Sequence, residues 1–118
     1  PPAELELVLR EHPSVRDAAV VGRPDARAGE VPVAYVVLAA PATPEELAAF
    51  VATRVAAHKR LRGVRLVDEL PRMPSGKLLR RVLRDRERAL AGRAAGVKAA
   101  AGVSPEGSPL PAAPTPRG

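Results

Sequence analysis

The chain has 118 residues, 46% of them hydrophobic, which leaves room for one small domain with a modest core rather than for two domains. It has no cysteine, no apolar run of membrane-spanning length and no signal peptide, so we expect a cytoplasmic protein without disulfides, metal sites or membrane spans. The net charge of +6 is uneven: residues 54–98 hold 14 lysines and arginines against 4 acids, and residues 1–53 hold 4 arginines and 8 acids. Anions should therefore be attracted to the second half.

The first half of the chain predicts a helix and two strands. Apolar residues spaced i, i+3 and i+4 predict a helix from Ala3 to Glu11, and Pro13 ends it because the residue before a proline leaves the helical region. Small and β-branched residues predict strands at Val15–Val21 and Val31–Leu38, with turn-forming residues between them. The short connection predicts that the two strands pair antiparallel.

The most regular helical pattern extends from Pro44 to Ala57. Thr43 is placed to cap this helix, and Glu46 is placed to accept a hydrogen bond from the backbone of Thr43, as in a capping box. The segment from His58 to Arg62 is mostly basic, which suits the negative end of the helix dipole. We therefore expect these cations to lie at the C-terminus of the helix.

The rest of the chain predicts a strand at Val64–Val67, a loop at Asp68–Ser75 and a helix from Lys77 to about Leu90. The residues that we expect this helix to bury are Leu78, Leu79, Val82 and Leu83. Ala, Gly and Pro dominate thereafter, so we assign residues 1–91 to the domain and expect residues 92–118 to form a disordered tail. The order α-β-β-α-β-α predicts an α+β fold with helices flanking a mostly antiparallel sheet.

The segment from Pro71 to Arg81 has the clearest functional pattern, because it sets Lys77 on a turn at the expected start of the last helix. The helix dipole disfavours a cation there, whereas an ammonium beside free N–H groups suits a phosphate or carboxylate oxygen. Pro71 stiffens the approach and Gly76 allows backbone angles that a side chain forbids. We expect Ser75 to shape this turn rather than to act as a nucleophile, because no His or Asp partner is near.

A nucleotide-binding P-loop is excluded, because that motif requires glycine where this chain has Pro71 and serine or threonine where it has Leu78. The pattern instead resembles the closing motif of the adenylate-forming enzymes, whose small C-terminal domain has a Pro-x-x-x-x-Gly-Lys sequence before a short basic helix. The motif positions here are Pro71, Gly76 and Lys77. The resemblance extends in order over about residues 1–88, through Pro2–Glu6, His12–Val15, Ala18–Gly22, Gly29–Val37 and Lys59–Arg62.

The resemblance implies the mobile C-terminal domain of an ATP-dependent acyl-CoA synthetase of the 4-coumarate-CoA ligase type. Lys77 is then the catalytic residue, and it bridges the acyl carboxylate and the ATP α-phosphate in a site built mostly by a larger N-terminal AMP-binding domain. The parent enzyme would use ATP, Mg²⁺ and CoA and form an acyl-adenylate. We expect the chain alone to bind no cofactor and to be inactive, since the large domain and the hinge with its second lysine would lie upstream of Pro1.

Three basic residues, Lys59, Arg60 and Arg62, are candidates for contacts with the phosphates of CoA or of a carrier protein's phosphopantetheine. The alternative is that they are solvated charges at a helix end. For Arg80 and Arg81 we favour solvation of the helix. For Glu30 we favour a plain strand-end charge.

Other functions remain open from the sequence. Within the family, the alternative is an adenylation domain of a peptide synthetase that serves a carrier protein. The basic half of the chain would also suit a nucleic-acid-binding module, but Tyr35 and Phe50 are the only aromatic residues and no reading motif is present. A non-catalytic interaction module is the third alternative. The acid that is activated is not readable from this chain, because the selecting pocket would lie in the larger domain.

Overall fold

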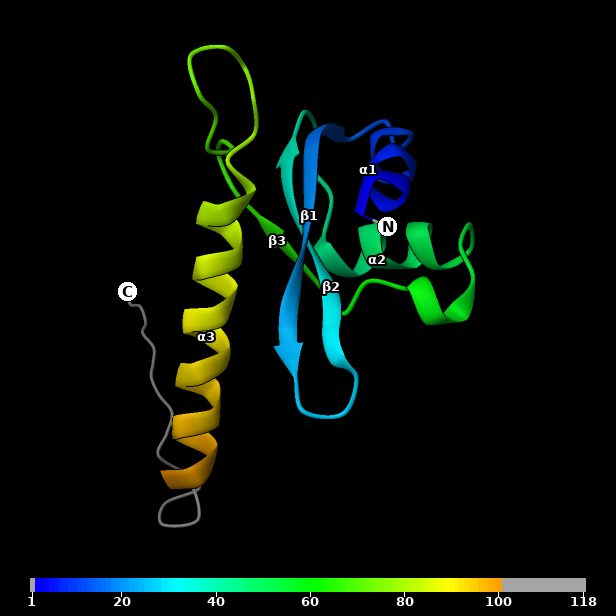
Figure 1. Cartoon of the computed structure of the whole chain (residues 1–118). Helices are drawn as coiled ribbons and strands as arrows, with labels where there is room; N and C mark the ends of the chain where they lie inside the picture. Colours follow the sequence, from blue (N-terminus) through cyan, green and yellow to red (C-terminus); the bar gives the residue numbers. More distant parts are fainter. Residues whose placement is uncertain (1, 101–118) are drawn as a thin grey trace, which may run out of the picture.

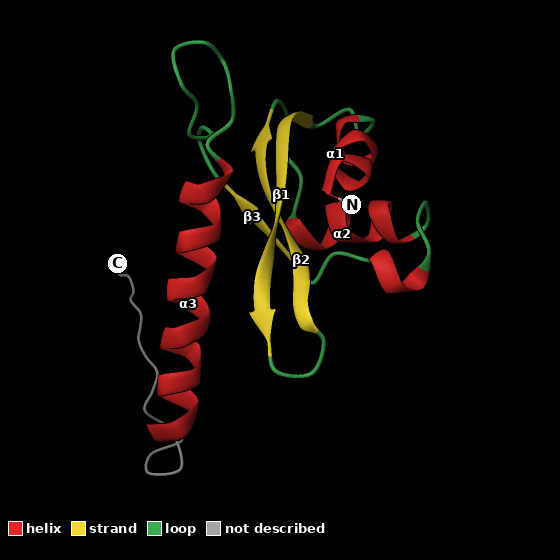
Figure 2. Ribbon diagram, viewed as in Figure 1, coloured by secondary structure: helices red, strands yellow, loops and turns green. Residues whose placement is uncertain are grey.

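The computed structural model describes residues 2–100, with side-chain surroundings given to residue 94. Its elements are α1 (Pro2–Arg10), β1 (Val15–Asp25), β2 (Gly29–Leu38), α2 (Pro44–Ala52), the short 3-10 helix η1 (Ala57–Lys59), β3 (Gly63–Leu66) and α3 (Arg80–Ala100). The predicted order α-β-β-α-β-α and the α+β class are confirmed (Figure 1, Figure 2). No helix of the described residues is long and apolar enough to cross a membrane.

The three strands form one sheet in the order β1-β2-β3. Strands β1 and β2 pair antiparallel, as predicted, from Val15 opposite Leu38 to Asp25 opposite Gly29. This antiparallel pair makes up most of the sheet, as expected, but strand β3 pairs parallel with β2, so the sheet is mixed. The reason is the connection: the chain passes through α2 between β2 and β3, and such a crossover returns the next strand in the same direction.

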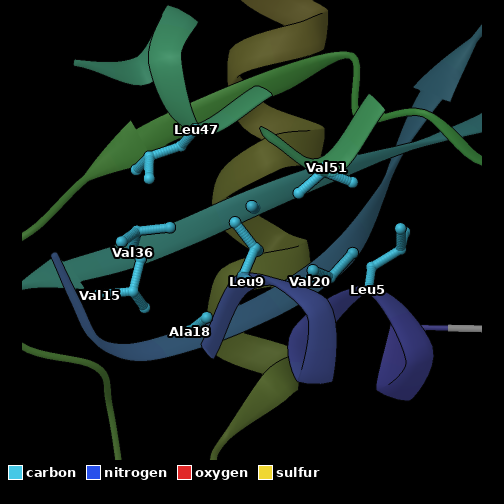
Figure 3. Close-up of a cluster of buried hydrophobic side chains, with 9 residues drawn as sticks. Leu5, Leu9, Val15, Ala18, Val20, Val36, Leu47 and Val51 are labelled. Carbon is cyan, nitrogen blue, oxygen red and sulfur yellow. The ribbon is translucent and has the colours of Figure 1, made fainter. Parts of the chain in front are cut away.

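Helices cover both faces of the sheet, with α1 and α2 on one face and α3 on the other (Figure 1). The core on the first face is drawn in Figure 3 and consists of Leu5, Leu9, Val15, Ala18, Val20, Ala34, Val36, Leu47 and Val51. The core on the α3 face consists of Ala19, Val21, Val33, Tyr35, Val37, Leu70 and Leu83. Because successive strand residues point to opposite faces, burial of both faces explains the continuous apolar runs 18–21 in β1 and 31–38 in β2.

The predicted capping box of α2 is present. The Thr43 hydroxyl accepts from the backbone N–H of Glu46 at 3.1 Å, and the Glu46 carboxylate accepts from the N–H of Thr43 at 3.4 Å. The helix nevertheless ends at Ala52, so the predicted end at Ala57 was wrong. The hydroxyl of Thr53 and the guanidinium of Arg54 both donate to the Phe50 carbonyl at 2.9 Å, which satisfies an oxygen that a longer helix would have bonded.

Helix α3 begins at Arg80 and continues to Ala100, whereas we expected it to start at Lys77 and to end near Leu90. Of the side chains that it was expected to bury, Leu83 is 3% exposed, but Leu79 and Val82 are 36% and 50% exposed. The helix rests on the sheet through a narrow stripe that contains Leu83 and Glu87, four residues apart, so their neighbours face outward. The helical backbone also covers residues 92–100 of the expected tail; the remainder, 101–118, lies outside the described residues.

A polar cluster under α3 was not predicted. The fully buried carboxylate of Glu87 accepts one hydrogen bond from the Tyr35 hydroxyl and two from the Arg65 guanidinium. The bond from Arg65 Nη2 to Glu87 Oε1 is 3.0 Å long. Burial favours the neutral acid, but the bonds from Arg65 and Tyr35 outweigh it and hold the pKa of Glu87 below its ordinary value of 4.5. The cluster therefore joins α3 to β2 and β3 by charge-assisted hydrogen bonds.

Candidate functional site

The motif around Lys77 forms a small hairpin between β3 and α3, which extends past the end of the sheet in Figure 1. The N–H of Gly76 donates to the carbonyl of Met73 and the N–H of Met73 donates to the carbonyl of Lys77, each at 2.8 Å. Arg72 and Leu78 form an antiparallel bridge that closes the hairpin. Gly76 has a φ of +95°, the left-handed region that favours glycine, so the expectation for this position is met.

Lys77 lies three residues before α3, on the returning arm of this hairpin, so our argument from the first turn of a helix was wrong. The helix dipole fades beyond the terminal turn and neither favours nor disfavours the cation strongly there. The side chain is exposed, and none of the described residues forms an ion pair or a hydrogen bond with its ammonium. The geometry leaves this charge available to an incoming anion.

The other predicted motif residues support the hairpin. The hydroxyl of Ser75 accepts from the backbone N–H of Lys77 at 3.4 Å, a contact that shapes the turn. The carbonyl of Pro71 accepts from the N–H of Leu79 at 2.9 Å, which joins the two arms at their base. These contacts act on the backbone of the hairpin and leave the Lys77 side chain unengaged.

Two residues that the sequence analysis missed hold the hairpin against β1. Arg72 donates from Nη1 to the Gly76 carbonyl at 2.7 Å and from Nη2 to Asp17 Oδ2 at 2.6 Å. Arg72 lies within the motif, five residues before Lys77, so the sequence already showed that the two residues are close together. Asp17 is 55 residues away along the chain, and no local pattern marked it.

The surface beside Lys77 is cationic. A shallow depression there is lined by Lys77, Leu78, Leu79, Arg80, Arg81 and Arg84, with no acid among them. Arg81 and Arg84 are exposed, and the nearest acid to Arg81 is Asp85 at 4.0 Å. An anion that approaches Lys77 is therefore also attracted by the positive charges at the start of α3.

Arg80 does not merely solvate the helix, which corrects our expectation. Its guanidinium donates to both carboxylate oxygens of the buried Glu6, at 2.5 and 2.9 Å, and to the Val20 carbonyl at 3.1 Å. Burial raises the pKa of Glu6, but the bonds from Arg80 and from the Val20 N–H outweigh this effect and lower it from 4.5. This fork anchors the first residue of α3, and with it the base of the Lys77 hairpin, to α1 and β1.

The second predicted group of cations lies elsewhere. Lys59 is in η1, and its ammonium is 2.9 Å from the Glu4 carboxylate of α1, while Arg60 and Arg62 are exposed in the extended segment that follows. Because α2 ends at Ala52, these residues do not lie at its C-terminus, which corrects that expectation; Lys59 is instead the last residue of η1 and Arg60 its C-cap. Figure 1 places the segment of η1 on the side of α1 and α2, away from the hairpin, so the fold does not bring Lys59 and Lys77 into one site.

A groove adjoins Lys59, lined by Pro2, Leu5, Val20, Val21, Gly22, Glu30, Val31, Pro32, His58 and Lys59. Glu30 is exposed at its rim, as expected for a strand-end charge, but its side chain lies across Gly22. A Cβ at Gly22 would come within 2.1 Å of the Glu30 Cδ, so a side chain at this position would push the flexible Glu30 carboxylate aside. Among the described residues, no group of three or more His, Cys, Asp or Glu side chains could hold a metal ion.

Comparison with known proteins identifies the domain. Residues 4–77 match the AMP-binding enzyme C-terminal domain family. A 4-coumarate-CoA ligase-like protein of Oryza sativa subsp. japonica is 59% identical over 86 residues, which cover 71% of this chain and 16% of that protein.

Solved structures agree with this match. The acyl-CoA synthetase of Brucella canis is 43% identical with a TM-score of 0.68, covering 73% of this chain and 17% of that one. ATP-bound MatB from Rhodopseudomonas palustris is 31% identical with a TM-score of 0.72, and the match covers 75% of this chain and 18% of that one. The chain thus spans about one sixth of the length of these relatives, and it belongs to the family of AMP-binding enzyme C-terminal domains.

Proposed function

We propose that this chain is the C-terminal mobile domain of an ATP-dependent acyl-CoA synthetase of the 4-coumarate-CoA ligase type, and that Lys77 assists its adenylation step. The parent reaction is carboxylate plus ATP to acyl-AMP and pyrophosphate, followed by acyl-AMP plus CoA to acyl-CoA and AMP. The observation that carries the proposal is the Lys77 hairpin, in which the motif lysine is exposed and unengaged by the described residues while its backbone is held.

The chemistry of adenylation requires such a cation. A carboxylate oxygen attacks the α-phosphorus of ATP, so two anions must approach each other and negative charge accumulates on the phosphoryl oxygens. An ammonium placed between them offsets their repulsion and stabilises the transition state. The carboxylate is already ionised and needs no general base, which agrees with the absence of His, Asp or Glu side chains from the depression beside Lys77.

The remaining parts of the active site would come from the larger N-terminal AMP-binding domain. ATP binding is supported by the ATP-bound relative from Rhodopseudomonas palustris. The described residues of this chain offer no acidic cluster that fits Mg²⁺, so we assign the chain no step through that ion. A free chain lacks the high effective concentration that linkage to its partner domain supplies, and we expect it to show no pyrophosphate exchange.

For the second step we propose that Arg60 and Arg62, with Lys59, contact the phosphates of the acceptor. Arg60 and Arg62 are exposed, and Lys59 is held at the edge of a groove by Glu4. Their separation from Lys77 supports a domain that rotates between the two steps and presents a different surface in each. CoA and a carrier-protein phosphopantetheine offer the same phosphate chemistry, and a direct comparison of the two as acceptors separates these partners.

The test uses the full-length parent with Lys77→Ala and compares its two half-reactions. Pyrophosphate exchange should fall by about 10²–10³-fold, the loss expected for one placed electrostatic group. Thioester formation from chemically made acyl-AMP and CoA should be retained, because no carboxylate must then meet a phosphate. Lys59→Ala is the matched control and should leave pyrophosphate exchange unchanged. Equal losses in both half-reactions of Lys77→Ala would show that the lysine is structural.

A further inference from the structure

The hairpin that carries Lys77 has little packing of its own. All of residues 72–77 are exposed, and a two-stranded hairpin without a packed face is marginal in water. Gly76 adds backbone freedom directly before the lysine. A contact between the hairpin and the rest of the domain must therefore set the direction in which the Lys77 side chain leaves the turn.

The Arg72 guanidinium is the group in the right place. It bridges the Gly76 carbonyl and the Asp17 carboxylate through two nitrogens of one rigid planar group. The Gly76 carbonyl belongs to the peptide unit whose N–H is that of Lys77. A bond to this oxygen orients the peptide plane, and the plane orients the Cα of Lys77.

Asp17, the other end of the bridge, is itself held in place. Its Oδ1 accepts from the N–H of Ala18 at 2.9 Å and from Nη2 of Arg10 at 3.2 Å. The pairing of β1 with β2 shifts register between Val15 and Asp17, an irregularity that re-aims a side chain at a strand end. The bridge therefore ties the hairpin to α1 and to the start of the central sheet.

We propose that Arg72 is a positioning residue for Lys77, which acts by holding the Gly76–Lys77 peptide against Asp17. This inference rests on the proposed function of Lys77. Arg72 does not touch the reacting atoms, so its loss should lower the turnover number of adenylation by about 10- to 100-fold, because a misplacement near 1 Å costs up to about 10²-fold. The Michaelis constants and the thioester half-reaction should change little.

The first experiment measures order in the 118-residue chain and needs no activity. Backbone ¹⁵N relaxation should give Gly76 and Lys77 order parameters near about 0.85 in the wild type and below about 0.6 in both Arg72→Ala and Asp17→Ala. Arg88→Ala, which removes an exposed pair with Asp85 on α3, is the control and should leave both values unchanged. Thermal unfolding should also stay near wild type, because exposed ion pairs add little to global stability. Unchanged order at Gly76 and Lys77 in Arg72→Ala would overturn the inference.

The second experiment asks whether Arg72 acts through Lys77 in the full-length parent. Adding Arg72→Ala to Lys77→Ala should cost nothing more in pyrophosphate exchange, because the positioned group is already gone. Arg72→Lys should recover only part of the rate, since an ammonium cannot reproduce the planar fork. Additive losses would place Arg72 on the substrate itself and refute positioning. Normal exchange by Lys77→Ala would refute the proposed function instead, and the order parameters would still report on the hairpin.

Discussion

The substitution Glu87→Gln tests the buried polar cluster that joins α3 to the sheet. Glu87 is fully buried and receives bonds from Tyr35 and Arg65, so the change removes a charge while nearly keeping the shape. Removing one partner of a buried ion pair costs about 3–5 kcal/mol, but the Arg65 side chain is 34% exposed and water would recover part of that loss. We expect the free energy of unfolding of the 118-residue chain to fall by about 2–4 kcal/mol.

Urea denaturation followed by circular dichroism measures this change, and Asp85→Asn is the matched control. Asp85 lies on the same helix with its side chain 57% exposed, and exposed pairs contribute about 0–1 kcal/mol. The double variant Glu87→Gln with Tyr35→Phe should cost less than the sum of the single changes, since Glu87→Gln weakens the same charge-assisted hydrogen bond that Tyr35→Phe removes. Two results would refute our account of the cluster. One is that Glu87→Gln and Asp85→Asn lower the free energy of unfolding by the same small amount; the other is that the losses of Glu87→Gln and Tyr35→Phe simply add in the double variant.

Three further predictions concern stability. The pKa values of Glu87 and Glu6 are lowered in the folded state, so their stabilisation is present above about pH 4.5 and should be lost as the pH falls through the folded values. Burial and the Glu87 carboxylate raise the pKa of Tyr35 from 10.0 to about 12, so stability should also fall between pH 10 and 12, and Tyr35→Phe should abolish this alkaline loss in urea titrations. Leu83→Ala should destabilise the domain by about 2–5 kcal/mol and Val82→Ala by less than about 1, because only Leu83 is buried; equal costs would contradict the packing of α3.

Patterns carried by neighbouring residues predicted the fold well. The capping box at Thr43, the antiparallel pairing of β1 with β2 and the order of the elements are confirmed, because each depends on residues close together in the chain. The family resemblance is confirmed for the same reason: it was read from ordered short motifs. The division into residues 1–91 and 92–118 stays a prediction.

The expectations that failed depended on competition between local patterns and distant partners. The apolar spacing of residues 44–57 could not show that Thr53 and Arg54 would end the helix at Ala52 through bonds to Phe50. Likewise, the apolar character of Leu79 and Val82 could not show that α3 would touch the sheet through a stripe centred on Leu83 and Glu87. A helical periodicity predicts which residues share a face, but the partner surface decides how much of that face is covered.

The candidate site divides in the same way. The turn chemistry of Pro71, Ser75, Gly76 and Lys77 is local, and the sequence was enough to identify this lysine as the residue that a turn presents. The placement of Lys77 on a hairpin rather than at a helix start depends on tertiary contacts, and so does the bond from Arg72 that attaches this hairpin to Asp17 across 55 residues. The ion pair of Glu6 with Arg80 across 74 residues and the bond of Tyr35 to Glu87 across 52 are of the same kind. Periodicity and turn signals report on residues within about one turn of each other, whereas a buried charge finds its partner only when the chain has brought distant segments together.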